Sequence, residues 1–259
     1  MTVDYRMDGD VAIVTLDRPE KFNSVSGDLS RGLMEAIARA GSEARAMILT
    51  GAGKAFCAGA DLSSMMADYE TGGPDLASAI EDRFNPMVQA LVESSVPTIA
   101  AVNGVAAGAG LGLALACDLR VMSSQAYFLS AFIGLALIPD TGSTWLLVHH
   151  LGLGRAMEFT ATNRRMLADE VASLGLARTC SPEELLAQAL ELGSDLAAGP
   201  TSAYVANRRI LFDAAASNFS VALEAERVTQ GELGGTALHL EGMNAFLDKR
   251  KPDFKSLGR

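Results

Sequence analysis

Two turns rich in glycine and alanine contain the residues of this 259-residue chain that could do chemistry through the backbone. The first, GAGKAFCAGADLSSM, covers residues 51–65 and follows an apolar stretch that ends at Thr50. Small side chains let a ligand approach the main chain, and a helix predicted from Asp61 to Tyr69 would leave the N–H groups near Ala60 unpaired. Such groups can bind an anion or stabilise an oxyanion. A tight turn with Asp61 as the helix N-cap is the structural alternative.

The second turn, VNGVAAGAGLGLALACD, covers residues 102–118 and again leads from a predicted strand into a helix. The predicted helix is apolar on every side, so it should be buried with the positive end of its dipole in the core. Gly108-Ala109-Gly110 could then place the N–H group of Ala109 opposite that of Ala60. A nucleotide-binding loop is the competing interpretation, but the sequence lacks a Gly-Lys-Ser/Thr ending and a GxGxxG followed by a well-placed acid.

The elements that must position these turns alternate between strands and helices, which favours an α/β core. We predict strands over residues 11–16, 46–50, 96–102, 119–122 and 126–129, and helices over 28–40, 61–69, 79–94, 203–216 and 221–232. From about Gly142 onward the chain is predicted to be mainly helical. We therefore divide it into a core over residues 1–198 and a C-terminal helical region over residues 199–259.

Composition and charge exclude several classes of function. The formal net charge of −10 disfavours nucleic-acid binding, although residues 249–255 form a local basic tail. Three cysteines without metal-type spacing and three scattered histidines predict reduced thiols and no metal site. No signal sequence is seen, and the apolar run over residues 104–117 is too short to span a bilayer. We therefore expect a cytoplasmic protein without membrane association.

GKAFCAGADLSSM followed by AAVNGVAAGAGLGLALACDLRV resembles the crotonase, or enoyl-CoA hydratase/isomerase, family. DRPEKFNSVS, FIGLALIPDTGSTWLL and AFLDKRKPDF extend the resemblance over nearly the whole chain. It implies a ββα spiral core with a C-terminal helical trimerisation region, and homotrimers that often pair as hexamers. It also implies an acyl-CoA thioester substrate whose carbonyl oxygen lies between the N–H groups of Ala60 and Ala109. Coenzyme A is then part of the substrate, and no separate cofactor is expected.

The resemblance also implies which residues contact coenzyme A: Lys21, Phe22, Ala58, Asp61, Leu62, Phe254 and Lys255. Lys21 and Phe22 match a loop that contacts the adenosine, and the tail residues Phe254 and Lys255 match residues that reach the nucleotide. A basic cluster suits the phosphates of coenzyme A. The structural alternatives are an exposed charge beside a packed aromatic ring in the loop, and a solvated terminal segment in the tail.

The sequence departs from the family where hydratases carry two glutamates that hold and activate water. Gly112 and Phe132 align with these two positions, and neither can carry a proton, so efficient hydration is not expected. Both would form part of the pocket wall. Glu81 and Asp82 on the predicted helix 79–94 could be pocket acids, but a solvated face is the preferred interpretation. His149 and His150 are interpreted as structural or surface residues.

Asp140 matches the position of the single catalytic acid in some isomerase branches. GLALIPDTGSTW looks most like ring-1,2-epoxyphenylacetyl-CoA isomerases and related Δ3,Δ2-enoyl-CoA isomerases. One carboxylate could move a proton from the α-carbon to the γ-carbon, and an apolar wall including Phe132 would raise its pKa and exclude water. A helix N-cap is the structural alternative for Asp140. An enoyl-CoA isomerase is the leading hypothesis, ahead of a hydratase of low activity and of a non-catalytic acyl-CoA-binding protein.

Overall fold

Six strands form the larger of two sheets in the computed structural model, which describes residues 2–66 and 72–258. Their spatial order is β1-β2-β3-β5-β7-β10; β1 pairs antiparallel with β2, and every other pair is parallel. The strands are β1 (Val3–Asp8), β2 (Val11–Leu16), β3 (Ala46–Gly51), β5 (Thr98–Val102), β7 (Leu119–Ser123) and β10 (Arg178–Cys180).

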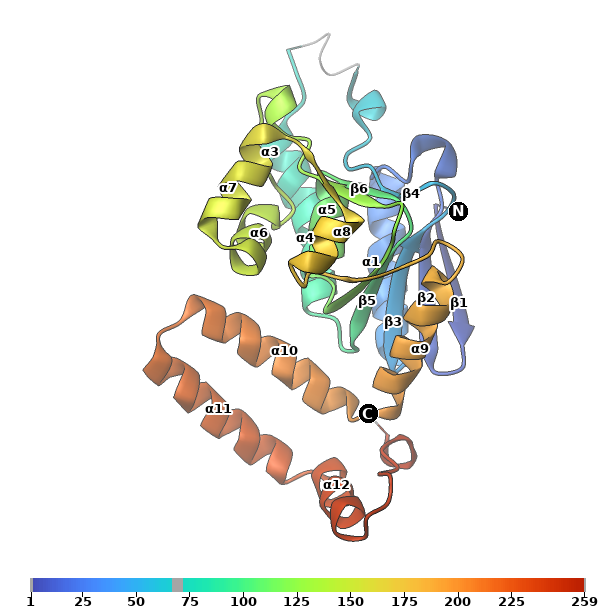
Figure 1. Ribbon diagram of the computed structural model, residues 1–259, viewed down its shortest axis with the longest axis vertical. Coiled ribbons are helices and arrows are strands. Elements are labelled where there is room, and N and C mark those ends of the chain that lie inside the picture. Colours follow the sequence, from blue (N-terminus) through green and yellow to red (C-terminus); the bar gives the residue numbers. More distant parts are fainter. Residues whose placement is uncertain (1, 67–71, 259) are drawn as a thin grey trace.

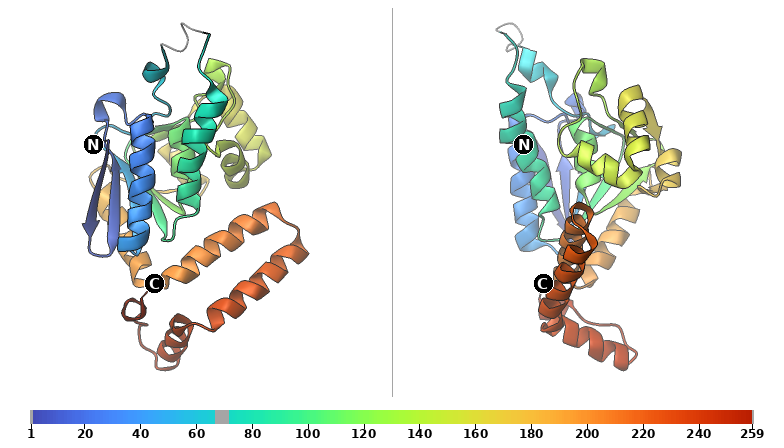
Figure 2. Two further views of the ribbon diagram at one scale, coloured as in Figure 1. Left: turned by 180° about the vertical axis from the view of Figure 1, so that it is seen from behind. Right: turned by 90° about the vertical axis from the view of Figure 1, so that its left-hand side faces the viewer.

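Helices cover both faces of this sheet, and successive residues of a strand face opposite ways. Val14 and Leu49 belong to a core shared with α1 (Gly27–Glu43), α4 (Asn85–Val92) and α5 (Ala109–Ala116). Ile13 and Ile48 pack on the other face, against α9 (Leu185–Ala198). Figure 1 shows α9 on one side of the sheet, and Figure 2 shows α1 and α4 from behind. Burial on both faces explains why the strands are almost continuously apolar.

A smaller sheet lies beyond the carboxyl ends of the larger one. It has the order β4-β6-β8-β9, with β4 (Ala55–Cys57), β6 (Val105–Ala107), β8 (Tyr127–Leu129) and an antiparallel β9 (Arg165–Leu167). β4 follows β3, β6 follows β5 and β8 follows β7, so the chain repeats a ββα pattern. The two turns singled out from the sequence are the points where β4 and β6 end.

The last three helices are α10 (Thr201–Ala216), α11 (Phe219–Gly234) and α12 (Ala237–Leu247). Figure 1 shows α10 and α11 as an antiparallel pair that extends away from the sheets. Arg208 fastens α10 to the core: its guanidinium donates to both carboxylate oxygens of Asp118 at 2.6 Å, and also to backbone carbonyls at the end of α4 and before β5. α9 ends at Ala198 and α10 begins at Thr201, where the sequence analysis divides the chain.

The remaining helices and single turns connect these elements. They are η1 (Pro19–Lys21), η2 (Leu62–Met65), α3 (Leu76–Ala79), η3 (Ile80–Phe84), η4 (Ile133–Leu135), α6 (Ser143–Leu151), α7 (Leu153–Thr162), α8 (Ala168–Ser173) and η5 (Lys255–Leu257). No helix in the described ranges is both long enough and apolar enough to cross a membrane.

The α/β class and the helical C-terminal region are confirmed, and several details of the prediction are wrong. Strands β1, β4 and β6 were not predicted. The part from about Gly142 onward is mainly helical, as expected, but it also contains the short strands β9 and β10. The helix predicted over 61–69 is a 3-10 turn that begins at Leu62, and its predicted end at Tyr69 lies outside the described residues. The helix predicted over 79–94 instead runs from Leu76 to Val92, with a π-helical turn in its middle.

Candidate functional site

The two glycine-rich turns touch each other through Gly59 and Gly108. Gly59 has a φ of +93°, and a β-carbon on it would lie 2.9 Å from the carbonyl oxygen of Ala107 and 3.5 Å from the backbone nitrogen of Ala109. The point that a β-carbon on Gly108 would occupy lies 3.7 Å from the α-carbon of Gly59. The structure therefore brings together the two turns that carry Ala60 and Ala109, as the sequence predicts.

The N–H groups of Ala60 and Ala109 donate to no acceptor within residues 2–66 and 72–258, whereas the N–H group of Asp61 donates to the Val25 carbonyl and that of Gly108 donates to the Leu129 carbonyl at 3.2 Å. Val25 donates to the carbonyl of Gly59 at 2.7 Å and accepts from the N–H group of Asp61 at 3.1 Å, so the turn is held on both sides of Ala60. Ala109 is the first residue of α5, whose first turn carries no acidic side chain. Two unpaired N–H groups, one of them at a helix start, can hold an oxygen that gains negative charge.

Asp140 lies in the segment just before α6 and is half-buried. Burial raises the pKa of its carboxyl above the ordinary value, and a 2.7 Å hydrogen bond donated by the Thr141 hydroxyl to Oδ1 acts in the opposite direction. Gly142 is the N-cap residue of α6, and no side chain caps the helix. The alternative that Asp140 serves as the N-cap is therefore wrong.

Thr141 holds an unusual backbone conformation next to this acid. It is buried and has a φ of +53°, in the left-handed region that β-branched residues avoid. Such a conformation costs about 1–3 kcal/mol and persists only where the surroundings impose it. Thr141 is not among the candidate site residues predicted from the sequence. The only feature of the sequence that pointed to its hydrogen bond with Asp140 is that the two residues are adjacent.

Gly112, which the family resemblance aligns with the first hydratase glutamate, packs directly against this segment. A β-carbon on Gly112 would lie 2.5 Å from the carbonyl oxygen of Thr141, 3.1 Å from its β-carbon and 3.0 Å from Oγ of Ser143. The space beside residue 112 is therefore filled by the chain that follows Asp140. Gly112 comes three residues after Ala109 in α5, which places the Asp140 segment beside the first turn of that helix.

Phe132 contributes an aromatic wall on the other side of the second turn. Its side chain is almost fully buried, and its ring atom Cζ lies 3.8 Å from the point that a β-carbon on Gly108 would occupy. The preceding residue, Ala131, has a φ of +68° and donates its N–H to Oδ1 of Asn163 at 2.8 Å. Asn163 holds the loop in place from the end of α7, and no motif in the sequence marked it.

Lys21, Phe22, Ala58 and Leu62 lie together at the first turn. The backbone N–H of Ala58 donates to the carbonyl of Phe22 at 3.0 Å, and Nζ of Lys21 donates to Oγ of Ser63 at 3.2 Å. The Phe22 side chain is 54% exposed and that of Leu62 is 45% exposed. Apolar surface and an ammonium group thus lie at the turn that carries Ala60.

The Asp61 carboxylate is buried and already engaged. It forms a 2.8 Å ion pair with Arg18 and accepts a 2.5 Å hydrogen bond from Ser63. Burial acts to raise the pKa of Asp61, but the hydrogen bonds from Ser63 and Arg18 and the charge of Arg18 lower it below the usual value. Asp61 is the N-cap residue of the turn that follows, but its side chain makes no capping hydrogen bond there. Arg18, which the sequence analysis missed, fixes the orientation of this acid.

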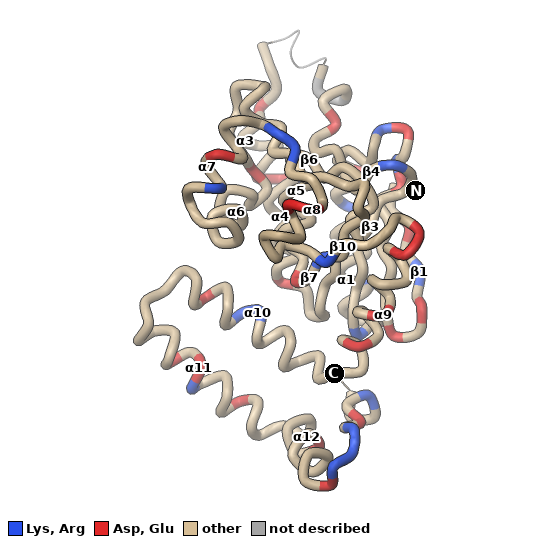
Figure 3. The backbone as a smooth tube through the Cα atoms, in the orientation of Figure 1, with Lys and Arg blue, Asp and Glu red and all other residues tan. Residues whose placement is uncertain are grey.

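Phe254 and Lys255 lie near the opposite end of the strands of the larger sheet. Lys255 forms an ion pair with Asp10, just before β2, and the Phe254 ring packs near Gly242 of α12. The first turn, by contrast, follows the carboxyl end of β3. Figure 3 shows the basic stretch directly after α12, far from β4 and β6. A single chain therefore does not bring the tail to the site.

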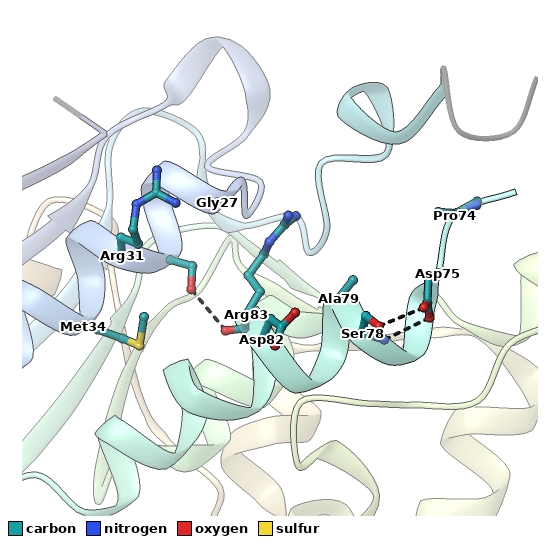
Figure 4. A pocket seen from close by; sticks show the side chains of 10 residues that line it. Gly27, Arg31, Met34, Pro74, Asp75, Ser78, Ala79, Asp82 and Arg83 are labelled. Atoms are coloured by element: carbon teal, nitrogen blue, oxygen red, sulfur yellow. Dashed lines mark hydrogen bonds between the residues drawn. The ribbon is translucent and has the colours of Figure 1, made fainter. Parts of the chain in front are cut away.

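A separate cavity of about 420 Å³ lies between α1 and the α3–η3 segment. Figure 4 shows its charged side chains, Arg31, Asp75, Asp82 and Arg83. Ser78 donates to Asp75, and Ser30 donates to the carbonyl of Arg83. None of the predicted catalytic or coenzyme A-binding residues lines this cavity, and Asp82 lies here rather than beside the two turns.

Comparison with known proteins places the chain in the family that the sequence resembles. The family model described as enoyl-CoA hydratase/isomerase matches residues 6–257. The chain belongs to the enoyl-CoA hydratase/isomerase, or crotonase, family. It is therefore a member of a family of enzymes that act on acyl-CoA thioesters.

Relatives with different names match the chain almost equally well. A protein of Rhodobacter capsulatus named "probable enoyl-CoA hydratase" is 37% identical over 98% of this chain and 97% of its own length. The 1,2-epoxyphenylacetyl-CoA isomerase of Escherichia coli is also 37% identical, over 94% of each chain. Among solved structures, an enoyl-CoA hydratase from Polaromonas is 31% identical, with a TM-score of 0.91 over 96% of this chain and 98% of its own. The crotonase fold predicted from the sequence is confirmed.

Proposed function

We propose that this chain is an enoyl-CoA isomerase in which Asp140 is the single proton shuttle. The observation that carries this proposal is the contact between Gly112 and Thr141. It leaves no room for a first hydratase glutamate and places a half-buried acid beside the helix start that offers the Ala109 N–H group. A carboxyl whose pKa is raised by burial is suited to take a proton and to return it.

In the proposed reaction, the substrate carbonyl oxygen accepts hydrogen bonds from the N–H groups of Ala60 and Ala109. The Asp140 carboxylate takes a proton from the α-carbon of a 3-enoyl thioester, and the electron pair moves into the carbonyl to form a dienolate. The two N–H groups stabilise the charge on the oxygen. Protonated Asp140 then returns the proton to the γ-carbon, which leaves a 2-enoyl thioester and the original carboxylate.

Phe132 supports isomerisation over hydration. Water must be held by polar partners before it can add to the alkene, and an aromatic ring against Gly108 offers none. A hydratase remains the alternative, because relatives of that name are as similar to the chain as the isomerase. A third candidate is an acyl-CoA-binding protein that keeps the two N–H groups as a clamp.

For coenzyme A, we propose contacts with Lys21, Phe22, Ala58 and Leu62, with Asp61 shaping the turn through Arg18. Phe254 and Lys255 would reach the nucleotide only from a neighbouring protomer. A homotrimer or hexamer is consistent with the large apolar side chains exposed on the C-terminal helices: Phe219, Leu240, Phe246 and Leu247. No cofactor besides the coenzyme A of the substrate is part of the proposal.

The test compares the wild type with Asp140→Asn, with Asp82→Asn as a matched control that removes a carboxylate elsewhere. Isomerisation of 3-hexenoyl-CoA is followed by the absorbance of the conjugated product, and affinity is measured with hexanoyl-CoA, which cannot isomerise. Asp140→Asn should abolish turnover while affinity and folding stay nearly unchanged, and Asp82→Asn should behave as the wild type. Undiminished turnover in Asp140→Asn would contradict the proposal.

The alternatives give different results in the same panel. Efficient hydration of crotonyl-CoA by the wild type would favour the hydratase. Tight binding of hexanoyl-CoA, with no turnover of 3-enoyl, 2-enoyl or epoxide thioesters, would favour the binding protein.

A further inference from the structure

The Asp140 carboxylate is held asymmetrically. Its Oδ1 accepts the hydroxyl hydrogen of Thr141 at 2.7 Å, whereas no described residue donates to Oδ2. The two oxygens of this acid are therefore not equivalent in the folded protein: Thr141 engages one and leaves the other available to a bound molecule.

The backbone of Thr141 is fixed from both sides. The carbonyl of Asp140 accepts the N–H of Ser143 at 2.9 Å, which closes a turn just ahead of α6. On the other side, the Thr141 carbonyl and β-carbon press against Gly112 of α5. These contacts impose the positive φ of Thr141 and aim its hydroxyl back at the preceding residue. A side chain at position 112 would break this arrangement.

We propose that Thr141 is a positioning residue that presents Oδ2 of Asp140 as the atom that takes and returns the substrate proton, with Gly112 as the surface on which Thr141 is seated. This inference rests on the proposed isomerase function. Thr141 does not touch the substrate in this scheme. By binding Oδ1, it prevents the carboxylate from rotating between two equivalent orientations, so the reactive oxygen is held in place before the substrate binds.

A purely structural role for Thr141 predicts different behaviour. A hydroxyl that only stabilises the turn would affect melting temperature and not the ionisation of Asp140. A hydrogen bond donated to the carboxylate favours its charged form, so its loss should raise the pKa of Asp140 and move the acidic limb of the pH–rate profile to higher pH. The pH profile therefore separates the two roles.

The experiment uses a set of variants matched in shape and chemistry. Thr141→Val keeps the β-branched shape and removes the hydroxyl, Thr141→Ala removes the hydroxyl without a β-branched residue at positive φ, and Thr141→Ser keeps the hydroxyl. Ser143→Ala is the control, because Oγ of Ser143 is buried beside Gly112 but has no hydrogen-bond partner in the described structure. All are assayed with 3-hexenoyl-CoA across pH, with Asp140→Asn in parallel.

Thr141→Val and Thr141→Ala should lower kcat between about tenfold and a hundredfold, because a hydrogen bond to a charged group is lost. KM should change little, since the thioester oxygen is held by Ala60 and Ala109, and the acidic limb should move to higher pH. Thr141→Ser and Ser143→Ala should retain wild-type kcat and pH profile. If Thr141→Val does not fold, Thr141→Ala carries the comparison.

Three results would overturn the inference. An inactive Asp140→Asn together with a wild-type kcat and profile in Thr141→Val would remove the role of Thr141 and leave the proposed function standing. Equal losses in Thr141→Val and Ser143→Ala would show a general packing effect. Full activity in Asp140→Asn would overturn the proposed function and the role of Thr141 with it.

Discussion

The backbone nitrogen of Ala109 lies 3.5 Å from the point that a β-carbon on Gly59 would occupy, and the carbonyl oxygen of Ala107 lies 2.9 Å from the same point. Residue 59 is therefore the contact between the two turns, and the residue after it carries the other unpaired N–H group. Only a residue without a side chain lets the two turns approach this closely. The separation of the two N–H groups depends on Gly59.

Gly59→Ala should push the turns apart and weaken stabilisation of the enolate. Loss of one donor to a developing oxyanion lowers kcat by roughly a hundredfold or more, so kcat/KM for 3-hexenoyl-CoA should fall by about that factor. Gly9→Ala is the matched control: Gly9 also has a positive φ of +56°, but nothing lies within 4 Å of its added β-carbon. Both variants should lose roughly 1 kcal/mol of stability, because alanine is disfavoured at positive φ. Only Gly59→Ala should lose activity. Equal activities would contradict the role of the contact.

The raised pKa of Asp140 predicts the pH dependence of both activity and stability. The acidic limb of kcat/KM should have an apparent pKa above the ordinary aspartate value of about 3.9. Because folding raises this pKa, the folded state binds more protons than the unfolded state between the two values, and this group makes stability fall as pH rises through that window. Above the pKa of the folded state, the carboxylate is charged in both states, and the full cost of burying that charge lowers the stability of the fold.

Asp140→Asn should therefore be more stable than the wild type at pH 7, and the difference should shrink as the pH is lowered toward about 4. Thermal melting of the two proteins from pH 4 to pH 8 measures this difference. The Thr141 hydroxyl can still donate to the asparagine side-chain oxygen, so the packing is preserved. A variant that is less stable than the wild type at pH 7 would show that the Asp140 charge is stabilised rather than penalised.

The sequence predicts the two turns correctly because each feature is local. Small residues follow an apolar strand and precede a helix, and the N–H groups of Ala60 and Ala109 are placed by that local order. Strands β4 and β6 could not be predicted, because three residues are too few to show an alternating pattern. Their pairing, β4 with β6 and β6 with β8, joins segments that are far apart in the sequence.

The other features that could not be predicted are contacts between residues far apart in the sequence. Arg18 and Asp61 are 43 residues apart, and Lys255 and Asp10 are 245 apart. A carboxylate beside a glycine turn gives no indication of which arginine will reach it. For the same reason, the family resemblance could assign Phe254 and Lys255 to the nucleotide, but it could not reveal that both residues lie far from the two turns of the same chain.

Arg208 should be the main polar anchor of α10, and its neighbour provides a matched control. The Arg208 side chain is nearly buried and pairs with Asp118 and three backbone carbonyls. Breaking such a buried pair costs about 3–5 kcal/mol, so Arg208→Ala should lower the free energy of unfolding by about that amount. Arg209→Ala removes an exposed 3.9 Å pair with Glu232 and a long 3.5 Å hydrogen bond to the Thr229 hydroxyl, and it should cost less than about 1 kcal/mol. Urea unfolding of both variants measures the difference, and similar losses would contradict the anchor role.

Gly112→Glu tests whether the hydratase glutamate and the Asp140 segment exclude each other. Simple restoration of the family pattern would suggest that this change adds hydratase activity. The structure predicts the reverse, because the first side-chain carbon would lie 2.5 Å from a backbone oxygen of Thr141 and that segment must move to admit it. The carboxylate of Asp140 would be displaced with it. Isomerisation should therefore fall by at least about a hundredfold, because a misplacement of about 1 Å is enough for such a loss.

The control for this change is Gly154→Ala, which adds a β-carbon at an exposed position of α7 where nothing lies within 4 Å. It should leave isomerisation unchanged. Hydration of crotonyl-CoA by Gly112→Glu should stay near background, since Phe132, which the resemblance aligns with the second glutamate, cannot hold water. Adding Phe132→Glu to Gly112→Glu should not restore isomerisation, because the Thr141 segment remains displaced. Retained isomerisation in Gly112→Glu, or efficient hydration by that single variant, would contradict this prediction. Either result would show that the Thr141 segment can move without displacing Asp140, and that another feature determines which reaction occurs.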